Sequence, residues 1–173
     1  MNQIRKNFPE NSQLVSYLNR IGVEFLMSEE DFSEKIIDDP KLLIVGLACN
    51  HEARLRLALI PLFLQKPEIA SILPLIVDDL PVSAQITLQC YYCASFYLQR
   101  KFKLRLKKLF GSQPLLPPLF IENLGLQTDG DPEENLKLLA QKHQLLTGRL
   151  INWYGTYEHA VQRLLVNKEK ETI

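Results

Sequence analysis

The sequence predicts an all-α fold: a single compact multi-helix domain of about seven helices, with proline-kinked helical hairpins around a long central helix. Two observations support this prediction. Apolar residues recur at intervals of three and four along most of the chain, as on the buried face of an amphipathic helix. Aspartate followed by proline, a pair that favours the start of a helix, occurs at Asp39-Pro40 and again at Asp131-Pro132.

Length and composition are those of one folded domain. The chain has 173 residues, of which 46% are hydrophobic and 23% charged, and a domain of this size buries about two-thirds of the surface that its unfolded chain exposes. We therefore expect one domain over residues 1–173, with flexible ends at 1–10 and 167–173. The proline-containing stretch 111–131 is the candidate internal boundary, although its apolar residues favour packing over independent movement.

Three helices are predicted in the N-terminal part of the chain. The first begins at Asn11 or Ser12, either of which can act as its N-cap. The second spans Ser28 to Asp39 and starts with acidic residues, which the helix dipole favours. The third has Asp39 as N-cap and Pro40 in its first turn. Its apolar run also fits a buried strand, and the cap favours a helix.

Prolines punctuate the next stretch of the chain. Asn50 can cap a further helix, and it is followed by Pro61, Pro67, Pro74 and Pro81. A proline inside a helix removes a backbone donor and restricts the residue before it. The stretch is therefore either a set of kinked helices or a series of short helices that each start at a proline.

The long central helix is predicted over Ser83 to Phe110. From Lys101 to Lys107 basic and apolar residues alternate strictly, which is also the pattern of a strand. Helix is favoured because Lys, Leu and Arg are helix formers, and because Gly111 and Pro114 follow as a typical helix ending. The predicted face consists of Leu88, Tyr91, Ser95, Leu98, Phe102, Leu106 and Leu109.

The C-terminal part predicts two further helices after the 111–131 connection, which can itself hold a short helix at Pro118–Asn123. Asp131 caps a helix that continues to about Leu146, and Gly148 interrupts it. The last helix carries one apolar face, formed by Trp153, Tyr157, Val161, Leu164 and Leu165.

Weak metal candidates are Cys49, His51, Cys90 and Cys93, which are ligand types that zinc accepts. Cys90 and Cys93 lie in an apolar helical run, where free cysteines act as small hydrophobic residues, so we expect no metal. We find no Gly-rich phosphate loop, nucleophile elbow or EF-hand in the sequence, and we expect neither a cofactor nor catalytic residues. Nothing in the sequence supports an enzyme.

The net charge of the chain is zero, and the sequence shows no targeting signal. Lysine and arginine balance aspartate and glutamate at 20 each, so any attraction to a polyanion depends on local clustering. The N-terminus lacks the apolar core of a signal peptide, and no window has the roughly 20 apolar residues of a spanning helix. We expect a cytoplasmic protein that does not bind a membrane.

A basic run is the main candidate for a binding surface. The predicted site residues are Arg100, Lys101, Lys103, Leu104, Arg105, Lys107 and Lys108. No acidic residue lies within the run. We therefore expect its positive charge to pair either with an acidic surface inside the protein or with an anionic partner.

Two functions fit this basic run. The first is a non-enzymatic interaction or regulatory module that docks an acidic protein surface, with Leu104 as an apolar anchor. The second is sequence-nonspecific nucleic-acid binding through phosphate contacts. The neutral overall charge favours the first. Self-association into a homo-oligomer is left open.

Overall fold

The all-α fold is confirmed by the computed structural model, which describes residues 8–25 and 36–172. Over these ranges the chain forms helices, turns and loops, without a β-strand. The helices are α1 (Asn11–Arg20), α2 (Pro40–Ala48), α3 (Ala53–Leu57), α4 (Leu59–Gln65), α5 (Leu73–Ile76), α6 (Val82–Lys101), α7 (Lys103–Phe110), α8 (Pro132–Thr147) and α9 (Trp153–Glu171), with the 3₁₀ helices η2 (Pro67–Ile72) and η3 (Val77–Asp79).

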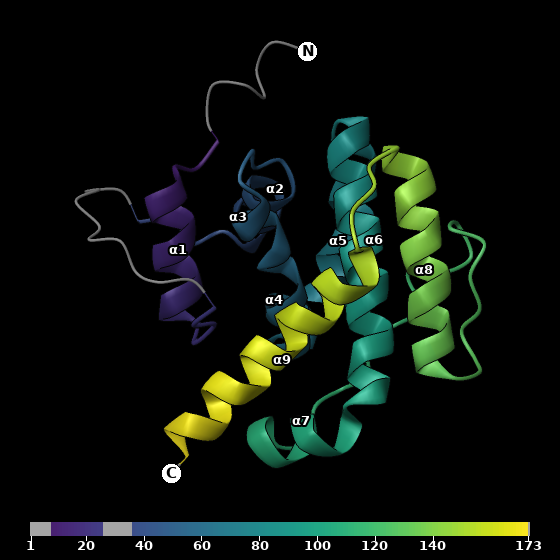
Figure 1. The fold of residues 1–173 in the computed structure, drawn as a ribbon. Helices are drawn as coiled ribbons and strands as arrows, with labels where there is room; N and C mark the ends of the chain where they lie inside the picture. The colour runs from purple at the N-terminus through teal and green to yellow at the C-terminus, as the bar shows by residue number, and fades with distance from the viewer. Residues whose placement is uncertain (1–7, 26–35, 173) are drawn as a thin grey trace.

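Helix α6 has the predicted central position. Figure 1 shows it running through the middle of the molecule, with α8 beside it and α9 crossing diagonally. Helices α4 and α8 pack directly against it, and every side chain from Cys90 to Gln99 is buried. The hydrophobic core is continuous and includes residues of α1 and α9 as well as of α6. Burial of apolar surface around α6 is therefore the main stabilising contribution to the fold.

Local helix signals are confirmed where an aspartate precedes a proline. The Asp39 side chain accepts a hydrogen bond of 3.0 Å from the backbone N–H of Lys41 at the start of α2. Asp131 caps α8 in the same way, through the N–H of Glu133. Helix α8 ends at Gly148, whose φ of 66° lies in the left-handed region that glycine adopts without a steric cost.

The start of the first helix differs from the prediction. Glu10, and not Asn11 or Ser12, is the N-cap of α1, where it forms a capping box with Gln13. The side chain of Asn11 instead donates to Glu52 and accepts from Asn50, so it is used to join α1 to the α2–α3 connection. The predicted second helix lies mostly outside the described residues.

The proline-rich stretch is a series of short elements, which is one of the two predicted arrangements. The prolines lie at their starts: Pro61 in the first turn of α4, Pro67 in η2, Pro74 in α5 and Pro81 before α6. No single helix in the described part of the chain is long and apolar enough to cross a membrane. Within that part, only a pair of segments meets that length and composition together, namely Ala53–Gln65 and Pro67–Asp79, and their axes are bent by 112° relative to each other.

The prediction of one continuous helix from Ser83 to Phe110 is wrong in its last third. Helix α6 ends at Lys101, and α7 begins after Phe102, which has φ −104° and ψ 23°. Figure 1 shows α7 turned away from the axis of α6. The turn places α7 against α9 and buries Leu106. Packing on α9, and not a glycine or proline, accounts for the break.

The 111–131 connection is fastened to α6 by tyrosine hydroxyls. Tyr92 donates to the carbonyl oxygen of Pro117, and Tyr97 donates to that of Gln127, each over 2.6 Å. Both rings are buried in the core. These bonds satisfy polar tyrosine atoms that burial would otherwise leave unpaired, and they hold a non-helical segment against the domain.

Gln99, two residues after Tyr97 on α6, also holds the connection. Its side-chain amide donates to the carbonyl oxygen of Pro114 over 3.0 Å and accepts from the backbone N–H of Leu116 over 2.8 Å. The short helix predicted at Pro118–Asn123 is instead a succession of turns, in which Phe120 has a positive φ of 64°. The connection is thus held by side chains of α6 more than by secondary structure of its own.

The last helix has the predicted buried face. Trp153, Tyr157, Val161, Leu164 and Leu165 are all buried. Helix α9 continues to Glu171 and so includes part of the segment 167–173 whose composition predicts a flexible end. Its last turns lie beside α7, where Glu169 binds Arg105 and Lys168 lies near the ring of Phe110.

Candidate functional site

The residues of the predicted basic surface fall into two groups. Arg100, Lys101 and Arg105 make hydrogen bonds within the protein. The second group consists of Lys103, Leu104, Lys107 and Lys108, which are exposed on α7 and are called here the α7 surface. Part of the basic run is thus hydrogen-bonded within the protein, and the rest is exposed to solvent.

Arg100 is an internal residue of the fold. One nitrogen of its guanidinium donates to the carbonyl oxygen of Phe96 over 2.9 Å, and another donates to that of Leu116 over 3.3 Å. Its central carbon lies 3.4 Å from the centroid of the Phe96 ring, in the geometry of a cation–π contact. Arg100 therefore helps to hold the 111–131 connection against α6.

Lys101 is paired with an acid of α9. Its Nζ donates to Glu158 and to the hydroxyl of Tyr154, and the Tyr154 hydroxyl in turn donates to Glu133 of α8 over 2.9 Å. Burial disfavours the charged form of Lys101, but the hydrogen bond and the negative charge of Glu158 outweigh it, so the pKa of Lys101 is raised. The ammonium group is part of a network that joins α6, α8 and α9.

Arg105 is paired with the last turns of α9. Two of its guanidinium nitrogens, Nε and one terminal nitrogen, donate to the same carboxylate oxygen of Glu169, over 3.1 and 2.9 Å. The other terminal nitrogen donates to Gln162 over 3.5 Å. Arg105 therefore faces α9, whereas the residue before it, Leu104, points outward: 83% of Leu104 is exposed.

The two groups are expected to respond differently to loss of charge. Lys101→Met leaves the largely buried Glu158 carboxylate without its cation, and we expect it to lower the free energy of unfolding by about 1–2 kcal/mol. Lys103→Met is the matched control on the exposed side, with an expected change within about 0.5 kcal/mol. Urea denaturation of both variants measures the difference. Equal losses would contradict the division of the basic run into internal and external groups.

A small hollow lies beside the exposed lysines. It has a volume of about 140 Å³ and lies between α7, the end of α4 and the start of the 111–131 connection. Lys103 and Lys107, on successive turns of α7, line it together with the apolar side chains of Leu64, Leu106 and Leu115. Leu115 is itself exposed. The hollow therefore combines apolar walls with two ammonium groups.

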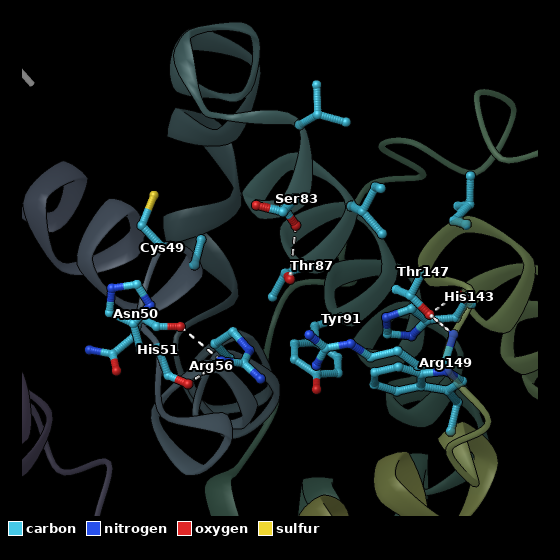
Figure 2. Close-up of a pocket in the computed structure, with 15 residues that line it drawn as sticks. Cys49, Asn50, His51, Arg56, Ser83, Thr87, Tyr91, His143, Thr147 and Arg149 are labelled. Atoms are coloured by element: carbon cyan, nitrogen blue, oxygen red, sulfur yellow. Dashed lines mark hydrogen bonds between the residues drawn. The ribbon is translucent and has the colours of Figure 1, made fainter.

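A larger cavity lies at the other end of α6. Its volume is about 500 Å³, and it opens between the α2–α3 connection, the first half of α6 and the turn from α8 to α9. Figure 2 shows its polar side chains, with Arg56, Tyr91 and Arg149 arranged across it. The polar and aromatic lining comprises Cys49, Asn50, His51, Arg56, Ser83, Thr87, Tyr91, His143, Thr147, Arg149 and Trp153.

One wall of this cavity contains a buried histidine. Only 2% of His143 is exposed, and its Nδ1 shares a hydrogen bond of 2.6 Å with the hydroxyl of Tyr157. The imidazole stacks on Trp153 with ring centroids 3.5 Å apart, and Tyr91 meets it edge-on at 5.7 Å. Burial lowers the pKa of His143 to about 3, because the surroundings solvate a cation poorly. The imidazole is therefore neutral at pH 7.

The weak metal candidates do not converge. Cys90 and Cys93 are fully buried in α6, and the thiol of Cys93 lies 3.7 Å from the carbonyl oxygen of Leu119. Burial raises the pKa of Cys90 to about 12, which disfavours the thiolate that binds zinc. Cys49 and His51 line the larger cavity instead. Within 8–25 and 36–172 no group of His, Cys, Asp or Glu side chains is arranged to hold a metal ion.

The structure thus places two of the predicted lysines, Lys103 and Lys107, at a hollow and adds a cavity that the sequence did not reveal. The cavity was missed because its lining comes from segments far apart in the chain, and no single segment carries a motif. No family model matches this chain, and neither a curated protein nor a solved structure is detectably similar to it. What the chain binds is therefore inferred from the shape and charge of its own surface.

Proposed function

We propose that the protein is a non-enzymatic interaction or regulatory module, which docks an acidic surface of a partner protein through the α7 surface. One observation carries the proposal: Lys103, Lys107 and Lys108 project from α7 with no acidic partner among the described residues, although α9 beside them supplies acids to Lys101 and Arg105. Lysine side chains without an acidic partner in the fold can pair with carboxylates of another molecule.

The hollow beside α7 supports a protein as the partner. Its volume of about 140 Å³ suits one apolar side chain, and its walls include Leu64 and Leu106. Lys103 and Lys107 at its edge can pair with acidic residues that flank such an anchor. Exposed Leu104 enlarges the apolar area on the outer side of the helix. An apolar centre within a charged rim is the usual composition of a protein interface.

Nucleic-acid binding through the same lysines is the alternative. Phosphate neutralisation depends on the number of free cations, and Arg100, Lys101 and Arg105 are bonded within the fold. The cations that stay outside occupy one short helix, and the overall charge of the chain is zero. An interface of this size gives little affinity for a duplex, so the acidic protein is favoured.

Reversing charge on the α7 surface is expected to abolish partner binding without unfolding the protein. Lys103→Glu combined with Lys107→Glu changes the free energy of unfolding by less than about 0.5 kcal/mol, because both side chains are exposed and unpaired within the described residues. Partner capture from the source cells, followed by identification of the bound proteins, then compares wild type with this variant.

The matched control is Lys41→Glu combined with Lys142→Glu, which changes the net charge equally at positions away from α7. Acidic proteins retained by wild type and by the control, and lost by the α7 variant, support the proposal. Equal capture by all three proteins contradicts it. Labelled DNA and RNA are titrated in parallel at two salt concentrations; strong binding that weakens steeply with salt would favour the alternative.

A further inference from the structure

The larger cavity is separate from the α7 surface. It is lined by the first half of α6, from Val82 to Tyr91, whereas α7 follows the end of that helix. Of the described residues that line it, none is an aspartate or a glutamate, and Arg56 and Arg149 both contribute. Two guanidinium groups brought to one cavity without a carboxylate produce a positive potential inside it.

Arg56 is held in place by the backbone beside it. One terminal nitrogen of its guanidinium donates to the carbonyl oxygens of Asn50 and His51, each over 2.8 Å. Figure 2 shows these bonds at the edge of the cavity. A guanidinium has donors on all three nitrogens, so Nε and the second terminal nitrogen stay available. A cation fixed in this way loses little side-chain entropy when it binds an anion.

Other donors face the same space. Tyr91 lines the cavity and is 4% exposed, and its hydroxyl has no hydrogen-bond partner in the described part of the chain. The side chain of Arg149, on the turn between α8 and α9, has none there either. Figure 2 places Tyr91 between Arg56 and Arg149. Donors outnumber acceptors in this arrangement, and an anion supplies the acceptors that are lacking.

The remaining wall is apolar and aromatic. Ile86, Leu146 and Trp153 line it. The indole N–H of Trp153 is buried without an acceptor among the described residues. Ligand pockets commonly combine an apolar wall with a few convergent polar groups, and a volume of about 500 Å³ is within their usual range.

We propose that this cavity binds a small organic anion, whose charged phosphate or carboxylate group is held by Arg56 and Arg149 and whose apolar body lies against Trp153 and Leu146. Guanidinium groups suit both anions because two of their N–H groups can donate at once to two oxygens of a carboxylate or of a phosphate. The inference is independent of the proposed function, since no residue of the α7 surface lines the cavity.

Trp153 gives the proposal a direct test because it is the only tryptophan of the chain. Titration with phenyl phosphate is expected to change its fluorescence saturably. Benzoate tests the carboxylate, inorganic phosphate tests the anion without an apolar body, and benzamide tests the body without a charge. We expect phenyl phosphate or benzoate to bind at least about tenfold more tightly than inorganic phosphate or benzamide. Isothermal titration calorimetry provides a second readout.

Arg149→Gln is the main variant, because the side chain is exposed and its loss is not expected to affect folding. It should weaken binding of the tighter probe at least about tenfold, and Arg56→Gln should do the same if it remains folded by circular dichroism. Lys41→Gln removes one positive charge from an exposed position outside both the cavity and the α7 surface, and should leave binding unchanged.

Three results would overturn the proposal: neither anionic probe binds at millimolar concentration, benzamide binds as tightly as they do, or Arg149→Gln and Lys41→Gln have equal effects. Failure of this test leaves the α7 variants unaffected, so the two proposals are separable.

Discussion

Lowering the pH from 7 to 5 is expected to destabilise the protein, and His143 accounts for about 2 kcal/mol of that loss. Burial holds the pKa of His143 at about 3 in the folded protein, whereas an unfolded histidine titrates near 6.5. Between these values the unfolded chain binds one more proton than the folded chain. The contribution of His143 is therefore fully present above pH 6.5 and is lost as the pH falls towards 3.

A double variant isolates this contribution. His143→Phe combined with Tyr157→Phe keeps two rings in the core while removing the imidazole and the hydroxyl that is hydrogen-bonded to it. Urea denaturation at pH 7, 6 and 5 should give a flatter pH dependence than wild type. His159→Gln serves as the control, because His159 is an exposed histidine on α9. The expectation fails if wild type and the double variant lose the same stability over this range.

Replacement of Gln99 by leucine is the second large effect that we expect, with a loss of about 2–4 kcal/mol in the free energy of unfolding. Gln99 is buried, and its amide satisfies both the carbonyl group of Pro114 and the N–H of Leu116. Leucine fits the volume but leaves the buried N–H of Leu116 without a partner. The cost of an unmet buried donor exceeds the gain from a more apolar side chain.

Gln89→Leu is the matched control for this substitution. Gln89 lies on α6 as well and is half-buried, and its side chain makes no hydrogen bond with the described residues. Thermal and urea unfolding should show a loss for Gln99→Leu and little change for the control. Limited proteolysis should show faster cleavage within 111–131 only for Gln99→Leu, since the connection loses a fastening. Similar behaviour of the two variants would contradict this role.

Features set by neighbouring residues were predictable from the sequence. The caps at Asp39 and Asp131 and the helix end at Gly148 depend on hydrogen bonds and backbone geometry within one turn, so the local sequence specifies them. The cap of α1 was misplaced for the opposite reason. Asn11 is a good capping residue by type, but a bond to Glu52 uses it elsewhere, and only the folded chain brings those two together.

The helix break at Phe102, the small hollow and the larger cavity could not be predicted from the sequence, because all three depend on tertiary packing. Lys101, Phe102 and Lys103 contain no helix-breaking residue, and the change of direction comes from packing on α9. The orientation of α7 determines which lysines of the run are exposed to solvent. Likewise, Arg56 of α3 and Arg149 of the turn between α8 and α9 line one cavity only because the folded chain brings these distant segments together. The basic run was recognisable by composition, and its division into internal and external residues was not.

The position of α7 depends on the last turns of α9. Arg105 binds Glu169, and the ammonium group of Lys168 lies 5.9 Å from the centroid of the Phe110 ring. Helix ends open more readily than helix centres, with free energies well below that of global unfolding. Opening of α9 near Glu169 therefore releases both contacts together and weakens the attachment of α7, which the buried Leu106 and the bond from Arg105 to Gln162 still hold. Local unfolding at one helix end is thus thermodynamically coupled to the orientation of Lys103 and Lys107.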